Sequence, residues 1–423
     1  MRVLALSSGT SVDAIDVALA DVSDADGVVT LRTLHAAERP WPADLRRRIL
    51  AALPPAPVGM GEVCALDTLI GQAFGDVGAW AIGAWGDVDL VASHGQTVFH
   101  WVEGGQVRGT LQLGSAARVA ALTGRPVVHD LRSSDIAHGG HGAPLVSLLD
   151  LLWLADRPTA AVNIGGIANV TLVGTGTGAG TGAGTGAGAA RAGDTGPGNC
   201  LIDVAAAALT GEPYDADGAI ARTGSVDARA LDALLADPFY ALPLPKSTGR
   251  ELFHAGYVAD VLSAAGVDVP AGADLLATLT ELTAVTIASH TGGVERVVVS
   301  GGGVRNSALM DALRRHASGI STSGVSTSGV STSDVSTSDV STSDVITSDE
   351  LGLPSDAKEA YLFTLLGYLS VRALPGTAEG PGGRRATGAR DAVVLGSLTP
   401  PAPAPCAPAS APVHRLIVEE GTA

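Results

Sequence analysis

The chain has 423 residues, of which 46% are hydrophobic, so it is long enough for full hydrophobic cores in two or three domains. Its formal net charge of −17 excludes a protein whose main partner is a nucleic acid, because the nucleic-acid backbone favours a basic protein face. Three widely separated cysteines indicate neither a zinc site nor a disulfide framework, and the lack of a signal peptide or of an apolar run of about 20 residues predicts a cytoplasmic protein without membrane segments.

The first predicted element is a β-hairpin near the N-terminus. Residues 3–6 and 15–20 form its apolar strands, and the turn at residues 7–11 is rich in small hydroxyl side chains around Gly9. Backbone N–H and hydroxyl groups on such a turn can bind phosphate oxygens. Asp13 and Asp16 flank the turn and could hold Mg²⁺ through water. A plain surface hairpin is the alternative interpretation.

Polar residues follow the next two predicted strands. The strand at 90–92 runs into a Ser-His-Gly-Gln-Thr sequence that contains His94, and the strand at 126–128 leads to Arg132 and Asp135. Open α/β sheets place their ligands at the carboxyl ends of strands, so these side chains are candidate site residues. Arg132 could clamp an anionic group of a substrate. A structural histidine and a surface Arg–Asp pair are the alternatives.

A second hairpin is predicted at residues 161–172, where Gly165 and Gly166 form the turn. Two hairpins in one chain, each with a glycine turn and with Asn or Asp nearby, resemble the duplicated phosphate-binding hairpins of the actin and hexokinase superfamily. The duplication is more specific than either hairpin alone.

Asp194 opens an Asp-Thr-Gly-Pro-Gly-Asn sequence that predicts a tight turn before a helix at residues 201–209. The carboxylate could take a proton beside a phosphate, and the start of the helix favours an anion. An ordinary Asx-turn is one alternative. An aspartic protease is another, but its chemistry needs a second such carboxylate, and the chain has no other Asp-Thr-Gly or Asp-Ser-Gly. The loop at residues 245–250 gathers two cations and two hydroxyls that could hold a substrate or cap a helix.

The remaining sequence predicts one further ligand site and several segments without structure. Gly301, Gly302 and Gly303 follow a strand and let the backbone lie against a flat ring, which suits adenine. Glu359 lies in the first turn of a predicted helix. Repeats at 174–190 and 320–345 are expected to be disordered insertions, and residues 401–423 are expected to form a flexible tail.

Taken together, these motifs resemble the anhydro-N-acetylmuramic acid kinase family over nearly the whole chain outside the two insertions. The matching segments, in chain order, are residues 8–16, 93–97, 130–137, 142–146, 163–169, 194–199, 245–252, 300–306 and 356–360. The chain departs from the family pattern at Ser7, where Met is usual, and at Ala14, where Gly is usual and an added Cβ alters the first hairpin.

The resemblance implies an α/β fold with two lobes, actin/hexokinase-like (ribonuclease H-like), and a central cleft between the lobes. Lobe I would comprise residues 1–132 and 357–400, and lobe II residues 133–356. ATP would lie in the cleft, with Mg²⁺, next to 1,6-anhydro-N-acetylmuramic acid. The family opens the anhydro bridge with water and phosphorylates the released 6-oxygen in peptidoglycan recycling. A homodimer is also implied.

The resemblance further implies a role for individual residues. Asp194 matches the catalytic aspartate, which would deprotonate the attacking water. The residues expected to bind the nucleotide are Gly9, Thr10, Ser11, Asp13, Asp16, Gly165, Gly166, Asn169, Gly301, Gly302 and Gly303. The residues expected to face the sugar are His94, Thr97, Arg132, Asp135 and Glu359. An actin-like ATP-binding protein that has lost catalysis is the alternative function.

Overall fold

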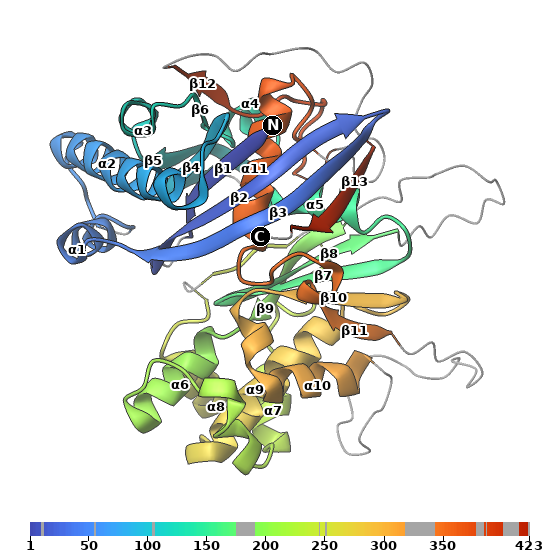
Figure 1. The fold of residues 1–423 in the computed structure, drawn as a ribbon. Helices are drawn as coiled ribbons and strands as arrows, with labels where there is room; N and C mark the ends of the chain where they lie inside the picture. The colour runs from blue at the N-terminus through green and yellow to red at the C-terminus, as the bar shows by residue number, and fades with distance from the viewer. Residues whose placement is uncertain are drawn as a thin grey trace. The chain divides into compact units, whose positions relative to one another are not determined.

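The computed structural model describes residues 1–9, 12–54, 56–103, 106–174, 191–244, 246–249, 252–317, 343–377, 385, 387–400 and 414–421. Thr10, Ser11 and most of the two repeat insertions lie outside the described residues. The chain divides into two compact units. Unit 1 comprises Met1–Trp153 and Leu351–Ala423, and unit 2 comprises Leu154–Glu350 (Figure 1).

Unit 1 is built on a mixed sheet with β1 near its middle. The order along the sheet is β12-β6-β4-β1-β2-β3-β13, and β5 pairs with β4. β1, β2 and β3 are antiparallel neighbours, whereas β4 is parallel to β1 and β6 is parallel to β4. The strands are β1 (Arg2–Ser8), β2 (Ala14–Ala25), β3 (Val28–Pro40), β4 (Leu90–Glu103), β5 (Gln106–Leu113), β6 (Val127–His129), β12 (Ser397–Thr399) and β13 (Arg415–Glu420).

Helices cover both faces of this sheet, which is why β1 reads as a continuous apolar run. Val3 and Ala5 pack in one core with α5 and α11, whereas Leu4 and Leu6 pack in another with α1, α2 and α3. At Gly71 on α2, an added Cβ would lie 2.7 Å from the backbone nitrogen of Ser115, so only glycine permits this approach. The helices are α1 (Ala43–Ala51), α2 (Met60–Trp85), α3 (Ala116–Thr123), α4 (Ser133–Ala137), α5 (Val146–Trp153) and α11 (Lys358–Val371).

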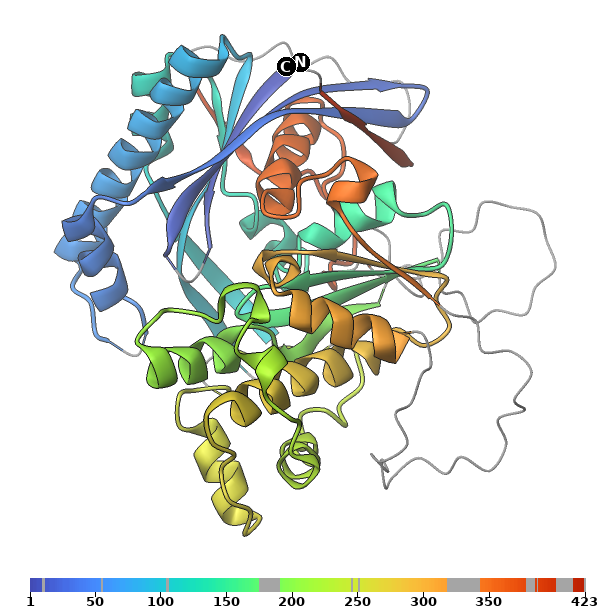
Figure 2. The ribbon, with the colours of Figure 1, turned by 60° about the horizontal axis from the view of Figure 1, so that its bottom comes forward.

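Unit 2 carries a second mixed sheet in the order β11-β10-β7-β8-β9. Its helices α6 to α10 lie on one side of the sheet in Figures 1 and 2. The strands are β7 (Thr159–Ile164), β8 (Ile167–Val173), β9 (Arg191–Pro197), β10 (Arg296–Ser300) and β11 (Asp344–Thr347). The α-helices are α6 (Cys200–Thr210), α7 (Ala228–Leu235), α8 (Tyr257–Ala264), α9 (Gly272–Ala288) and α10 (Ser307–Ala317), with short 3-10 turns at Ala216–Gly218, Ala221–Thr223, Gly302–Arg305 and Asp349–Leu351.

The two sheets repeat one topology. In each, the first strand lies in the middle, the next two strands add antiparallel on one side, and two later strands add parallel on the other side. The pattern is β3-β2-β1-β4-β6 in unit 1 and β9-β8-β7-β10-β11 in unit 2. The α/β class is therefore confirmed, and the repeated order is that of a duplicated ribonuclease H-like fold.

Several expected boundaries differ from the structure. The segment 133–153 lies in unit 1 and not with residues 154–350, because α5 packs against α11 and β13. The expectation of a flexible tail is wrong at its end, where β13 pairs in parallel with β3 and covers an edge of the sheet. Residues 344 and 345, expected in a disordered insertion, belong to β11.

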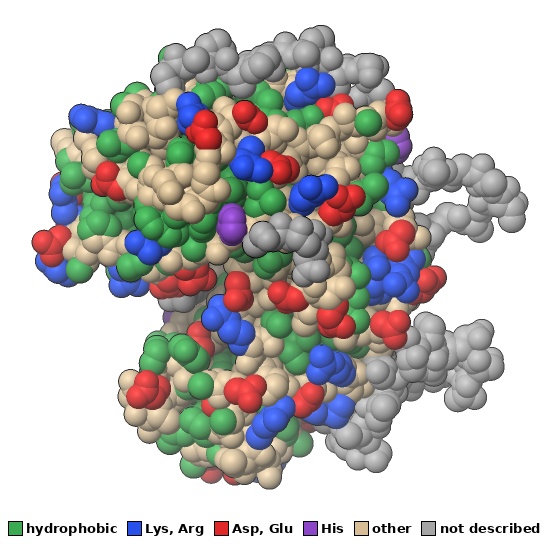
Figure 3. All heavy atoms as spheres, in the orientation of Figure 1, with side chains coloured by type: hydrophobic (Ala, Val, Ile, Leu, Met, Phe, Trp, Pro, Cys, Tyr) green, Lys and Arg blue, Asp and Glu red, His purple; other side chains and the backbone are tan. Residues whose placement is uncertain are grey.

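The surface carries charges of both signs. On the face shown in Figure 3, acidic side chains lie among basic ones over both units. Among the described residues, no helix is both long enough and apolar enough to span a bilayer.

Candidate functional site

The turn of the first hairpin, between β1 and β2, is held by side chains from other elements. The carbonyl oxygen of Gly9 accepts hydrogen bonds from the backbone N–H of Val12 at 3.1 Å and from Nε2 of Gln96 at 3.1 Å. Arg46 on α1 donates from Nε to the Val12 carbonyl at 2.7 Å and pairs with the exposed Asp13 carboxylate at 3.3 Å. The backbone on both sides of the tip is thereby fixed, as a phosphate-binding turn requires.

Asp16 lies on β2, opposite Ser7 of β1, in an acidic environment. Burial raises the pKa of Asp16 to about 7, and the charges of Glu359 and Glu38 add to the effect. Glu359 is exposed in the first turn of α11. Burial lowers the pKa of the Arg132 guanidinium, and Glu359 acts in the opposite sense. The structure therefore brings the predicted residues Asp16, Arg132 and Glu359 into one electrostatic environment in unit 1.

His94 and Arg132 are joined by a hydrogen bond. Nε of Arg132 donates to Nε2 of His94 at 2.8 Å, so this histidine nitrogen is the acceptor and Nδ1 carries the proton. Nδ1 then donates to the carbonyl oxygen of Gly95 at 3.0 Å. The ring stacks on Phe363 of α11 with centroids 4.5 Å apart. Burial and the Arg132 charge hold the pKa of His94 well below its usual value, so His94 is neutral and holds Arg132 in place.

Asp135 shapes a loop and is completely buried in this structure. Its Oδ2 accepts the backbone N–H of Gly142 at 2.7 Å, and its Oδ1 accepts the hydroxyl of Thr387. Gly140 leaves no room for a side chain, because an added Cβ would lie 2.1 Å from Oδ2 of Asp135. Arg132 donates to the carbonyl of Gly142. Asp135, expected to face the sugar, thus supports the loop to which Arg132 is bound and offers no exposed surface to a ligand.

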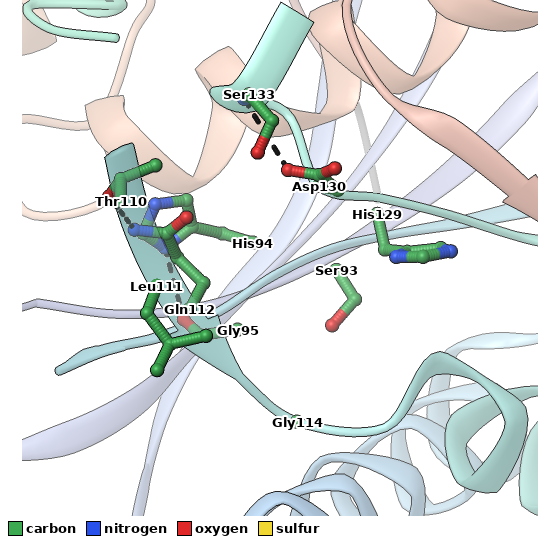
Figure 4. A pocket seen from close by; sticks show the side chains of 10 residues that line it. All are labelled: Ser93, His94, Gly95, Thr110, Leu111, Gln112, Gly114, His129, Asp130 and Ser133. Carbon is green, nitrogen blue, oxygen red and sulfur yellow. Dashed lines mark hydrogen bonds between the residues drawn. The ribbon is translucent and has the colours of Figure 1, made fainter. Parts of the chain in front are cut away.

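A cavity of about 290 Å³ lies beside His94, between residues 93–95 of β4, residues 110–112 of β5 and the carboxyl end of β6 (Figure 4). Ser93 and Gln112 line it from β4 and β5, and His129 and Asp130 line it from the end of β6. Ser93 is 1% exposed, and its hydroxyl has no hydrogen-bond partner among the described residues. Gln112 also donates to the hydroxyl of the predicted site residue Thr97 at 3.2 Å. The cavity therefore presents hydroxyl, amide and carboxylate groups.

In unit 2, the turn of the second hairpin is bonded to the start of α6. The carbonyl of Gly165 accepts the N–H of Asn199 at 2.8 Å, and the carbonyl of Gly166 accepts those of Gly198 at 2.9 Å and Cys200 at 3.1 Å. The hairpin therefore occupies the amides of residues 198–200 in this structure. An anion at the start of α6 stays a prediction.

Asp194 lies on a strand and not on the predicted tight turn. It is part of β9 and pairs with Asn169 of β8, so the candidate catalytic residue and the second hairpin are direct neighbours. Oδ2 of Asp194 accepts hydrogen bonds from the hydroxyl of Ser247 at 3.0 Å and from the backbone N–H of Thr248 at 2.8 Å. The N–H of Asp194 donates to the carbonyl of Lys246 at 2.8 Å. The loop that contains residues 246–248, which was expected to bind substrate or cap a helix, therefore binds Asp194 by hydrogen bonds.

The three glycines after β10 differ in their surroundings. Gly301 has φ 85° and lies against Asn163, and an added Cβ at Gly303 would meet Cγ2 of Ile164 at 2.3 Å. A Cβ at Gly302 would have no heavy atom within 4 Å. Gly301 and Gly303 thus allow the turn to pack directly against the end of β7, and Gly302 is the position open to a flat ligand.

Several residues of these sites have no clear sequence signal. Gln112 comes from β5, a strand without a predictive sequence pattern, and Phe363 reads as one apolar residue of a buried helix. Ser247 and Thr248 lie in a motif whose role was left open. Ser93 and Asp130 lie in the segments 93–97 and 130–137, but nothing in the sequence indicates that their side chains point into a cavity.

The described residues contain no group of three or more His, Cys, Asp or Glu side chains that could hold a metal ion. Two units of the same ribonuclease H-like topology, each beginning with a hairpin, define the actin/hexokinase-like class. The glycine-rich turn after β10 and the carboxylate beside the second hairpin agree with this class.

Comparison with known proteins identifies the family. The model of the anhydro-N-acetylmuramic acid kinase family matches residues 1–339 and 334–401. Anhydro-N-acetylmuramic acid kinase of Streptomyces avermitilis is 46% identical over 411 residues, which cover 95% of this chain and 94% of that protein. The protein of the same name from Rhodococcus erythropolis is 46% identical over 408 residues, covering 95% and 94%. The chain belongs to the anhydro-N-acetylmuramic acid kinase family, and it is a kinase.

Among solved structures, xylulose kinase from Rhodospirillum rubrum is similar with a TM-score of 0.37 and 12% identity, covering 76% of this chain and 85% of that chain. The activator of 2-hydroxyisocaproyl-CoA dehydratase from Clostridium difficile, with bound ADPNP, is similar with a TM-score of 0.35 and 11% identity, covering 87% and 94%.

Proposed function

We propose that this chain uses ATP and water to convert 1,6-anhydro-N-acetylmuramic acid into N-acetylmuramic acid 6-phosphate and ADP, in the recycling of peptidoglycan in the cytoplasm. One observation carries the proposal. In a chain of this kinase family, the carboxylate of Asp194 lies beside the second hairpin and is oriented by two donors. One oriented carboxylate meets the need of a reaction in which a single proton must be removed from water.

The proposed chemistry uses one base. Asp194 takes a proton from water, the water oxygen bonds to the anomeric carbon, and the bond from that carbon to the 6-oxygen breaks. The 6-oxygen bonds to the γ-phosphorus of ATP, and the bond to the β-phosphate oxygen breaks to release ADP. Placing these atoms in line accounts for most of the catalysis in phosphoryl transfer.

Contacts to the sugar are proposed for unit 1. Arg132 is held by His94 and by the Gly142 carbonyl, so its guanidinium is pre-oriented for a carboxylate or hydroxyl of the substrate. The hydroxyl, amide and carboxylate groups of the cavity beside His94 suit sugar hydroxyls. Glu359 is exposed and shares the environment of Arg132. Asp194, the proposed base, belongs to unit 2.

The described residues fit the nucleotide and Mg²⁺. The open position at Gly302 suits adenine, and the phosphates are proposed to lie beside Gly9 of the first hairpin and Gly166 of the second. Mg²⁺ at a nucleotide needs only one or two protein carboxylates, because phosphate oxygens and water complete its shell. Asp13 and Asp16 are two such carboxylates beside the first hairpin. When bound, Mg²⁺ would neutralise charge on the phosphates.

The test is Asp194→Asn, with the exposed Asp232→Asn on α7 as a matched control. We expect Asp194→Asn to lose both bridge opening and phosphorylation by about 10²- to 10⁴-fold while binding of ATP persists, and the control to keep full activity. Mass spectrometry of the sugar products and calorimetry with ATP are the measurements. Sugar phosphate formed by Asp194→Asn at the normal rate would refute the role of Asp194. Wild-type protein that binds ATP but forms no product would support the degenerate alternative.

Homodimerisation is a separate part of the proposal, supported by the family resemblance. Analytical ultracentrifugation should give twice the chain mass, and a single-chain mass at micromolar concentration would contradict it.

A further inference from the structure

Two donors from one short loop converge on one oxygen of Asp194. The hydroxyl of Ser247 lies 3.0 Å from Oδ2 and the backbone nitrogen of Thr248 lies 2.8 Å from the same atom. The preceding residue, Lys246, accepts the backbone N–H of Asp194 at 2.8 Å. The loop therefore pairs with the backbone of β9 at Asp194, and its next two residues donate hydrogen bonds to the carboxylate. Hydrogen bonds to an ionised acceptor are stronger and more directional than neutral ones.

The loop is anchored on its other side by the buried side chain of Lys246. Nζ donates to the carbonyl oxygens of Phe239 at 3.1 Å and Tyr240 at 3.2 Å, and it lies 4.5 Å from the centroid of the Phe239 ring. Lys246 is 8% exposed. Burial lowers the pKa of the Lys246 ammonium, and the charge of Asp194 acts in the opposite sense. Lys246 is thus hydrogen-bonded through its backbone to Asp194 and through its side chain to the carbonyl groups of Phe239 and Tyr240.

The close approach of this loop depends on glycine in β9. A Cβ at Gly193 would lie 2.8 Å from the carbonyl oxygen and 2.9 Å from the nitrogen of Lys246. The loop and the strand are therefore in backbone contact next to Asp194, which leaves little room for the carboxylate and its donors to shift.

We propose that the loop 246–248 is a positioning device for the catalytic base. Ser247 and the Thr248 amide hold the Asp194 carboxylate in one orientation, and Lys246 fixes the loop that carries them. This inference rests on the proposed function of Asp194. Ser247 acts through Asp194 and is a positioning residue, so its loss affects the rate of the chemical step more than the binding of either substrate. A misdirected base can reduce a rate by about 10²-fold.

The test compares Ser247→Ala with Ser247→Thr, which keeps a hydroxyl, and with Ser263→Ala, an exposed serine on α8. We expect Ser247→Ala to lower kcat about 10- to 100-fold, with the KM values for ATP and the anhydro-sugar changed less than about threefold. Ser247→Thr should recover most of the lost rate. Ser263→Ala should match wild type.

The outcomes separate this inference from the proposed function. An inactive wild-type protein would contradict the proposed function. An active wild type with Ser247→Ala at the same kcat would overturn the positioning role alone. A raised KM at unchanged kcat would also overturn it, because it would indicate direct contact of Ser247 with a substrate. As a readout independent of activity, a crystal structure of Ser247→Ala should show the Asp194 carboxylate less well ordered than in wild type, because only the Thr248 amide still holds Oδ2, and an equally well ordered carboxylate would count against the inference.

Discussion

The buried ion pair between Lys358 and Asp150 offers a sharp test of the packing in unit 1. Nζ of Lys358, at the start of α11, lies 2.6 Å from Oδ1 of Asp150 on α5, and the two side chains are 4% and 2% exposed. The contact is an ion pair and not a well-directed hydrogen bond. Removal of one partner leaves the other charge buried without compensation.

The expected magnitude follows from that burial. Asp150→Ala should lower the free energy of unfolding of unit 1 by about 3 to 5 kcal/mol, a large part of the roughly 5 to 15 kcal/mol available to a typical domain. The double variant Asp150→Leu/Lys358→Met replaces both charges by apolar groups. It should be about as stable as wild type or more stable, because neither desolvated charge is left.

Tryptophan fluorescence during urea unfolding reports this unit selectively. All five tryptophans belong to unit 1, namely Trp41, Trp80, Trp85, Trp101 and Trp153. Asp44→Ala breaks the exposed pair with Arg47 on α1 and is the matched control, with an expected change below about 0.5 kcal/mol. A cost below about 1 kcal/mol for Asp150→Ala, or a double variant as unstable as the single one, would refute the reasoning.

Three further predictions concern the site. The pKa of Asp16 is raised to about 7, so the folded state holds a proton that the unfolded state releases near pH 4. The free energy of unfolding should therefore fall as the pH rises from about 4 to 7. Asp16→Asn should remove about 2 to 4 kcal/mol of that loss, measured by urea unfolding at several pH values. Gly303→Ala should cost about 1 to 3 kcal/mol through overlap with Ile164, whereas Gly302→Ala should leave stability unchanged and weaken ATP binding in calorimetry. His94→Leu removes the acceptor of Arg132 and should raise the KM for the anhydro-sugar about 10-fold, and His94→Gln should recover part of it.

Each of these predictions has an opposing result. Parallel pH profiles for Asp16→Asn and wild type would exclude Asp16 as the titrating group. Normal ATP affinity in Gly302→Ala would argue against adenine at that turn. An unchanged KM in His94→Leu would show that Arg132 does not need its histidine partner for sugar binding.

Local patterns in the sequence were sufficient to predict the framework of the molecule. The apolar run at residues 3–6 and the glycine turn at 165–166 predicted the two hairpins, and the structure contains both as β1–β2 and β7–β8. The order of motifs predicted the family, which the comparisons confirm. These inferences succeed because strand periodicity, turn residues and motif spacing depend on neighbours in the chain.

Only the tertiary structure decided which groups meet. Asp194 was expected on a turn, but pairing with β8 extends β9 through it, and its partners lie 53 and 54 residues away at Ser247 and Thr248. Likewise, Arg415–Glu420 follows a proline-rich segment, yet it forms β13 on β3. No local periodicity encodes such contacts, because they depend on the edges and loops that remain available after the sheets have formed. The sequence by itself therefore determined the hairpins, the helix after Asp194 and the family, and the packing of distant segments determined how the base, the arginine and the sheet edges are held.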